Sequence, residues 1–221
     1  MTQLQITFDI IQTDQQLEKL FLLEIVKELN ARIPKIMPRM TDKMRVATFN
    51  FLKATDTYQS LVSGGLAYHF GLPTGGRKQR IDTIIQAVAN RMEVEFIPVK
   101  LISKQFKKGI RFRVLLRDLS EVLTLPESLV LTEKGELLEW LHWLLELGDK
   151  IIINEYEIEL GSGRGRSGGA IMVPEKSGSW RVPPKYAGTI SKNWLTRALT
   201  KNGGAYLSII EEIIKKEMQG M

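Results

Sequence analysis

A glycine-rich run in the last third of the chain limits the fold more than any other feature. The run reads GSGRGRSGG at 161–169, and five of its nine residues are glycine. Glycine inside a helix or strand costs about 0.5–1 kcal/mol relative to alanine, so neither element is expected to cross this run. The strand-like stretches 151–160 and 170–174 flank it, which predicts a β-hairpin with a long, flexible Gly/Arg loop.

The same run contains glycines at 163, 165 and 168, the G-x-G-x-x-G spacing of a dinucleotide-binding loop. Such a loop needs a helix to begin directly after it, so that the helix amides face the pyrophosphate. A β-like stretch follows here instead, so we do not interpret the run as a nucleotide site. Two interpretations remain: a solvent-exposed hairpin loop, or a loop in which Arg164 and Arg166 become ordered against an acidic or anionic partner.

Hydrophobic periodicity over the rest of the chain predicts an α+β fold, with N-terminal helices, a central antiparallel β-sheet with a packed helix, and C-terminal helices. We expect a single domain over 1–221, from which a β-hairpin at about 93–118 and the loop at 161–169 protrude. The expected strands include 4–11 and those named above. The expected helices are 14–33 (ended by Pro34), 38–54, 56–63, 79–91, 131–149 (capped by Thr132), 191–199 (capped by Ser191) and 205–218.

The residue types for common active-site chemistry are scarce. The chain has no cysteine, which excludes disulfides, thiolate metal sites and a cysteine nucleophile. Its two histidines, His69 and His142, sit between apolar or aromatic neighbours and are interpreted as packed side chains. The Walker A motif is absent from the sequence. We therefore expect no catalytic residues, no cofactor and no metal, and a chain that is not an enzyme.

The hairpin at 93–118 is basic within a chain whose formal net charge is +6. Its cations follow one another without an acidic residue between them: Lys100, Lys104, Lys107, Lys108, Arg111 and Arg113. Such a run can follow a nucleic-acid backbone, and Lys104, Lys107 and Lys108 are the candidate contacts. The favoured interpretation is a solvated hairpin, because lysines on strand edges commonly prevent aggregation.

Two further patterns suggest contacts with neighbouring molecules. Glu155, Glu157 and Glu159 alternate along a strand, but no nearby Asp or His completes an acid–base or metal set. We expect them to face lysines or arginines of a neighbour. A rigid segment rich in proline and tryptophan is interpreted either as a buried wrap-around segment or as an interface anchor; its residues are Trp180, Pro183, Pro184 and Trp194.

The N-terminal stretch 1–12 lacks a basic leader, a long apolar run and a small-residue cleavage site, so we expect no signal peptide. The longest apolar stretch, at 137–147, is too short to span a bilayer. A cytoplasm-like compartment is expected.

Four stretches of sequence carry a resemblance to a known family. They are TYQSLVSGGLAYHFGL at 57–72, IDTIIQAV at 81–88, YEIELGSGRGRSGGAIMV at 156–173 and WRVPPKYAGTISKNWLTRAL at 180–199, followed by a last amphipathic helix. Together they resemble the neck and tail-completion (head–tail joining) proteins of tailed bacteriophages, over about 15–214. The β-hairpin and the helix at 135–147 match this family less clearly.

The resemblance implies a structural virion protein, made in the bacterial host cytoplasm and located in the virion neck. It implies a homo-oligomeric ring between the portal-side connector and the tail-tube or tail-terminator proteins, with passing contact to genomic DNA and none to a membrane. The family offers no active site to carry over. The Gly/Arg loop, the glutamate strand and the Trp/Pro segment would contact neighbouring copies, and the loop would become ordered mainly in the ring. The alternative is a nucleic-acid-binding protein using the basic hairpin and the Gly/Arg loop.

Overall fold

One long helix, α1 (Asp14–Lys53), occupies the region where two helices were expected. Pro34 and Pro38 both lie inside it, although a proline in a helix interior removes a hydrogen bond and costs about 3 kcal/mol. Both prolines are exposed, whereas Ile33, Ile36 and Met40 are buried at helical spacing. Burial of this apolar face on both sides of each proline explains why the helix continues through them.

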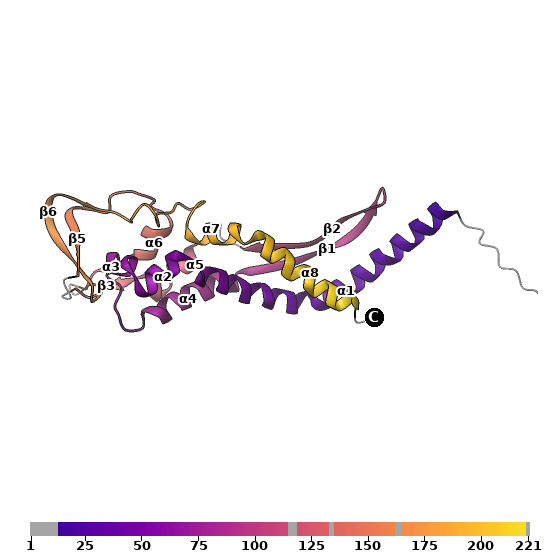
Figure 1. Ribbon diagram of the computed structural model, residues 1–221, viewed down its shortest axis with the longest axis horizontal. Helices are drawn as coiled ribbons and strands as arrows, with labels where there is room; N and C mark the ends of the chain where they lie inside the picture. The colour runs from indigo at the N-terminus through magenta and orange to yellow at the C-terminus, as the bar shows by residue number, and fades with distance from the viewer. Residues whose placement is uncertain (1–12, 115–118, 133–134, 162–164, 220–221) are drawn as a thin grey trace, which may run out of the picture. The chain divides into compact units, whose positions relative to one another are not determined.

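The computed structural model describes residues 13–114, 119–132, 135–161 and 165–219. These residues form helices and two-stranded sheets, so the α+β class is confirmed (Figure 1). The strand expected at 4–11 lies outside the described residues. Where the sequence predicted one domain, contacts divide the chain into two compact units. The first unit is Met1–Met40 with Val94–Phe112, and the second is Thr41–Glu93 with Arg113–Met221.

The β-hairpin expected at 93–118 is present in the first unit, as strands β1 (Met92–Ile102) and β2 (Gln105–Val114). Its turn is only Ser103 and Lys104, and the strands extend directly from both sides of it. Both turn residues have positive φ, at 48° and 62°, as a two-residue type I′ hairpin turn requires. The basic side chains after the turn therefore stand on a strand.

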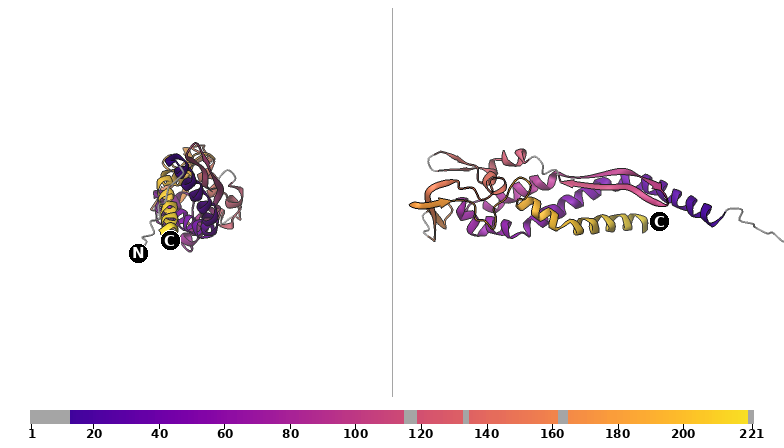
Figure 2. Two further views of the ribbon diagram at one scale, coloured as in Figure 1. Left: turned by 90° about the vertical axis from the view of Figure 1, so that its right-hand side faces the viewer. Right: turned by 90° about the horizontal axis from the view of Figure 1, so that it is seen from above.

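A side-chain amide joins the hairpin to α1 within the first unit. Asn30 Nδ2 donates to the Val99 carbonyl at 3.1 Å, and the Val99 amide donates to Asn30 Oδ1 at 2.8 Å. Val99 is buried, so these two bonds satisfy backbone groups that β2 does not pair. Figure 2 shows β1 and β2 running beside α1.

The second unit holds most of the core. Its helices and turns are α2 (Asp56–Ser63), α3 (Gly65–His69), α4 (Arg77–Asn90), α5 (Ser120–Leu123), the 3₁₀ helix η1 (Pro126–Ser128), α6 (Trp140–Leu145), α7 (Trp194–Lys201) and α8 (Gly203–Gln219). The helix expected at 79–91 is confirmed as α4, and its apolar face is fully buried.

The region expected to be one helix over 131–149 is a small hairpin followed by a short helix. Strand β3 (Val130–Leu131) pairs antiparallel with β4 (Leu137–Leu138), and α6 begins only afterwards. Gly135 has φ 84° and its amide bonds the Thr132 carbonyl at 3.0 Å, which closes the turn. The Thr132 hydroxyl, expected to cap a helix, accepts from the Glu136 amide within that turn. Of the helix predicted over 131–149, only the part at Trp140–Leu145 is present.

Aromatic side chains form the centre of the core. Phe70 lies against Trp140 and Trp180, with ring centroids 5.5 and 6.0 Å apart, and Trp143 meets Trp180 at 5.4 Å. Trp194 is buried in the same cluster, and its indole Nε1 donates to the Thr55 hydroxyl at 2.7 Å. Thr55 is also the N-cap of α2, so one hydroxyl joins the start of α2 to α7.

The two C-terminal helices follow the sequence prediction closely. Asn193, rather than Ser191, caps α7, through a reciprocal pair of bonds with Thr196. The stripe expected on α8 is buried at Tyr206, Ile210 and Ile213. Figure 2 shows α8, in yellow, beside the C-terminal part of α1, where the Tyr206 and Thr48 hydroxyls are 2.9 Å apart.

Replacing Asn30 with Ala is expected to release the hairpin from α1. The Val99 amide would lose its acceptor in a buried position, which costs about 1–3 kcal/mol, equivalent to an exchange rate about 5- to 150-fold faster. Amide hydrogen exchange measured at Val99 checks this. The control Asn90→Ala removes an exposed amide from α4 and should leave exchange at Val99 unchanged; equal exchange in both variants would contradict the clamp.

Candidate assembly surfaces

The described part of the Gly/Arg run, 165–169, is held in place by contacts within the chain, which corrects the expectation of a flexible loop. Arg166 Nε donates to the Gly71 carbonyl at 2.8 Å, and its Nη1 donates to the Leu131 carbonyl at 2.9 Å. Ser167 is only 1% exposed. Arg164 lies outside the described residues. Ordering of Arg166 therefore does not depend on a partner.

Two glycines in this run are required by close packing. A Cβ on Gly165 would lie 1.7 Å from the Ala170 carbonyl oxygen, and a Cβ on Gly169 would lie 2.6 Å from the ring of Tyr68. Neither position can hold a side chain unless backbone or ring moves. The glycine content, interpreted from sequence as flexibility, thus permits tight contact with α3.

Arg77, which sequence reasoning missed, completes the attachment of the run. It begins α4, is 6% exposed, and donates to the carbonyls of Leu72 at 2.6 Å and Ser167 at 2.9 Å. Its guanidinium also lies 5.5 Å from the ring centre of Tyr68. We call Arg77 and Arg166 the arginine clip, because together they tie the loop after α3 to the loop before β6. No sequence motif marks Arg77.

The glutamate strand forms an exposed, acidic surface. Strand β5 (Ile153–Leu160) pairs antiparallel with β6 (Ala170–Trp180), shown in orange in Figure 1, and we call this pair the acidic hairpin. Glu157 lies opposite Val173 and Glu159 opposite Ile171, so these two share a face. Glu155, with φ 61°, lies in the irregular part of the pairing, where the expected alternation is broken.

The three carboxylates have no cationic partner within the described chain. All are exposed, and none forms an ion pair there. Large apolar side chains are exposed on the same hairpin, at Tyr156, Leu160 and Met172. Because successive side chains of a strand point to opposite faces, these apolar side chains lie on the face opposite Glu157 and Glu159, and the hairpin has an acidic face and a partly apolar face.

The cations expected for nucleic-acid contact are all exposed on the first unit. We call β1–β2 with Lys100, Lys104, Lys107 and Lys108 the basic hairpin. Lys104 pairs with Glu18 of α1, whereas Lys107 donates only to the neutral Gln105, at 2.7 Å. Neither Lys100 nor Lys108 has an ion pair within the described residues.

The first unit also leaves large apolar side chains uncovered. On α1, Phe21 is 69% exposed and Leu20 is 51% exposed, and on the basic hairpin Ile102 and Phe106 are also exposed. Sequence reasoning placed Leu20 and Phe21 on a helix. It did not predict that the described first unit leaves both side chains uncovered.

The Trp/Pro segment divides between core and surface. Trp180 and Trp194, named as interface anchors, are 4% and 2% exposed and belong to the core, so neither ring is presented to a partner. This corrects the anchor interpretation for both tryptophans and agrees with the wrap-around alternative. Pro183 is half-buried and Pro184 is exposed.

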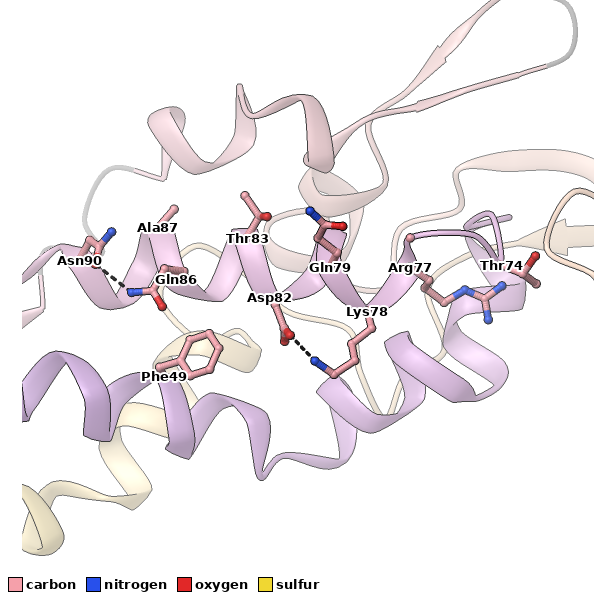
Figure 3. A pocket seen from close by; sticks show the side chains of 11 residues that line it. Phe49, Thr74, Arg77, Lys78, Gln79, Asp82, Thr83, Gln86, Ala87 and Asn90 are labelled. Carbon is pink, nitrogen blue, oxygen red and sulfur yellow. Dashed lines mark hydrogen bonds and ion pairs between the residues drawn. The ribbon is translucent and has the colours of Figure 1, made fainter.

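An open groove runs along α4 in the second unit (Figure 3). Asp82 accepts from the Tyr58 hydroxyl at 2.6 Å and from Lys78 Nζ at 2.5 Å. Burial raises the pKa of Asp82, but the bonds from Lys78 and Tyr58 outweigh it and hold that pKa below its usual value. Burial and the bond to Asp82 raise the pKa of Tyr58. Both groups are therefore fixed in one protonation state near neutral pH and act as a tether between α2 and α4.

A second pocket, of about 580 Å³, lies between α3 and the acidic hairpin and includes His69, Trp143 and Trp180. His69 Nδ1 and Trp180 Nε1 are buried there without a hydrogen-bond partner in the described chain. Burial lowers the pKa of His69, so its ring is neutral at neutral pH. His142 lies elsewhere, with its Nδ1 3.2 Å from Glu146.

Within the described ranges, no cluster of three or more His, Asp or Glu side chains has a geometry suited to a metal ion. No helix in those ranges is both long enough and apolar enough to cross a bilayer. Comparisons with protein-family models, with characterised proteins and with solved structures give no match. Function must therefore be argued from the surfaces themselves.

Two substitutions test the arginine clip. Arg166→Ala leaves two backbone carbonyls without their donors and should lower the free energy of unfolding by about 1–3 kcal/mol. Gly165→Ala should cost more, because its new methyl group meets backbone rather than a movable side chain. Denaturant unfolding of the monomeric chain measures both. Unchanged stability in both variants would contradict the clip and support the flexible loop predicted from the sequence.

The Asp82 tether gives a pH-dependent prediction. Because the folded-state pKa of Asp82 lies below its ordinary value of 3.8, the carboxylate stabilises the fold above that pH. This stabilisation is lost as the pH falls through the folded-state pKa. Asp82→Asn should therefore be less stable than wild type at pH 7, and the difference should shrink as the pH approaches 3. Urea unfolding at several pH values checks this, and a constant difference would contradict it.

Proposed function

We propose that this chain is a subunit of a homo-oligomeric ring, a neck or tail-completion protein that joins the head connector of a tailed bacteriophage to its tail. In this proposal it is a structural virion protein without a catalytic reaction of its own. It is made in the bacterial host cytoplasm and contacts portal-side and tail-tube or tail-terminator proteins. Support comes from the resemblance over 57–72, 81–88, 156–173 and 180–199 and from the surfaces described above.

The observation that carries the proposal is the uncovered apolar area of the first unit. Full burial of one leucine or phenylalanine side chain contributes about 1.5–3 kcal/mol. Leu20, Phe21, Ile102 and Phe106 forgo most of this gain in the isolated chain. An isolated two-stranded hairpin is itself only marginally stable in water. A unit built from one helix and one hairpin therefore gains stability by packing against other molecules.

The different character of the two exposed surfaces supports the proposal of a ring of identical copies. The basic and acidic hairpins belong to the same chain and are not self-complementary. Contacts between unlike surfaces are heterologous, and they generate closed rings when the rotation between copies closes. A neck protein must also surround a channel for DNA, and a basic net charge is compatible with DNA passing nearby.

Nucleic-acid binding by the basic hairpin is the second candidate function. Lys100 and Lys108 lack ion pairs in the described chain, and Phe106 is exposed beside them. A binding role predicts affinity for duplex or single-stranded DNA that falls steeply with salt concentration. Binding that survives removal of the charges at Lys104, Lys107 and Lys108 would contradict this function.

The ring proposal is tested by replacing exposed apolar residues of α1. The double variant Leu20→Ser with Phe21→Ser should weaken self-association by at least about tenfold, since each buried side chain contributes more than 1 kcal/mol. Native mass spectrometry and electron microscopy of the purified full chain measure the assembly. The fold should be unaffected, because both side chains are exposed.

Leu207→Ser on α8 is the matched control, since Leu207 is also exposed. It should leave assembly at the wild-type level. A wild-type chain that remains monomeric at all concentrations and does not occur in phage particles would contradict the proposed function.

A further inference from the structure

We infer that the basic hairpin of one copy docks on the acidic hairpin of the next copy, and that this contact joins neighbouring copies around the ring. The inference rests on the proposed homo-oligomer and adds the contact that holds it. It assigns a role to Lys107, Lys108, Glu157 and Glu159, whose charges have no opposite partner within the described chain.

The two surfaces match in chemistry and are opposite in sign. On the basic hairpin, Lys107 and Lys108 are exposed on β2; on the acidic hairpin, Glu157 and Glu159 are exposed on one face of β5. When these surfaces meet, each charge gains a counter-charge. Complementary charge of this kind sets the register of a contact and suppresses wrong pairings.

A second copy is the occupant that the charges favour. Arg166 was expected from the sequence to become ordered against an acidic or anionic partner, but it already binds the Gly71 and Leu131 carbonyls. The other cations that the sequence analysis proposed as contacts are exposed on the basic hairpin. Nucleic acid would provide counter-charges for the lysines but none for the glutamates. A neighbouring copy satisfies both surfaces at once.

Both hairpins also have outer strand edges, of which the β1 edge is bound at Val99 by Asn30. Each sheet has only two strands in the described chain, so every strand is an edge strand. Edge strands pair readily with strands of another molecule unless charge prevents it. Like-charged hairpins repel, whereas a lysine-bearing edge and a glutamate-bearing edge attract. The charge pattern therefore permits contact between unlike hairpins and opposes contact between like ones.

A charge-reversal experiment tests the contact. One variant carries Lys107→Glu with Lys108→Glu, the other carries Glu157→Lys with Glu159→Lys, and a third carries all four changes. Each two-site variant should associate with itself at least about tenfold more weakly than wild type, because like charges then face each other. The four-site variant should recover association, because its charges are again complementary.

Mixing the two two-site variants shows whether the contact joins different copies. The variant with Lys107→Glu and Lys108→Glu is negative on both hairpins, and the variant with Glu157→Lys and Glu159→Lys is positive on both. In the mixture, each contact between the two variants therefore joins a negative hairpin to a positive one. An equimolar mixture should therefore assemble although neither component does. Recovery in the four-site variant without recovery in the mixture would overturn the inference, since that pattern indicates a contact inside one chain.

The absence of native cysteine allows a direct test of proximity. Lys107→Cys in one copy and Glu157→Cys in a copy of different mass should form a mixed disulfide dimer under mild oxidation. Lys201→Cys paired with Glu157→Cys is the control and should form little, because Lys201 lies on α7 outside both hairpins. Equal yields from both pairs would contradict the contact.

The outcomes separate this contact from the proposed function. If wild type assembles and all reversals assemble equally well, the ring remains and the hairpin contact is wrong. If wild type stays monomeric at every concentration, the homo-oligomer and the contact both fail. Thermal unfolding of each variant should match wild type, because the four replaced side chains are exposed.

Discussion

A helix and a hairpin cannot cover each other's apolar side chains on all sides, and this constraint governs the first unit. Asn30 satisfies the backbone of Val99 and fixes the hairpin to α1, but the fixed pair still exposes Phe21 and Phe106. In the second unit the helices and aromatic residues enclose a common core, although its acidic hairpin also exposes Tyr156, Leu160 and Met172. Both units therefore leave large apolar side chains uncovered by the described chain.

Sequence reasoning succeeded where one regular pattern dominated. The buried stripe of α4 and the stripe on α8 repeat at helical spacing, and the strands at 93–102 and 151–160 alternate strongly enough to fix their type. The basic and acidic hairpins were therefore predictable as elements and as charged surfaces. Their exposure was also predictable, because charged side chains without partners remain in water.

The errors arose where distant contacts decide the outcome. Pro34 ends a helix according to local preference, but burial of Ile33 and Ile36 on the opposite face outweighs that preference. The local sequence around Trp194 is equally compatible with a core and with an interface position. Only the folded structure shows that its indole is bonded to Thr55. Arg77 carries no local signal, because its acceptors are backbone carbonyls that only the folded loops bring together.

The arginine clip changes how the Gly/Arg run is expected to affect assembly. A flexible loop that becomes ordered on binding loses conformational entropy at the interface, which weakens the contact. Here Arg77 and Arg166 have already fixed the described part of the loop that joins β5 to β6 in the free chain, and Gly165 and Gly169 permit the close packing that this needs. Glu157 and Glu159 then stand on a strand of fixed register. Gly165, Gly169, Arg77 and Arg166 therefore act within the chain, and in the proposed ring they hold the acidic surface in position before the next copy binds.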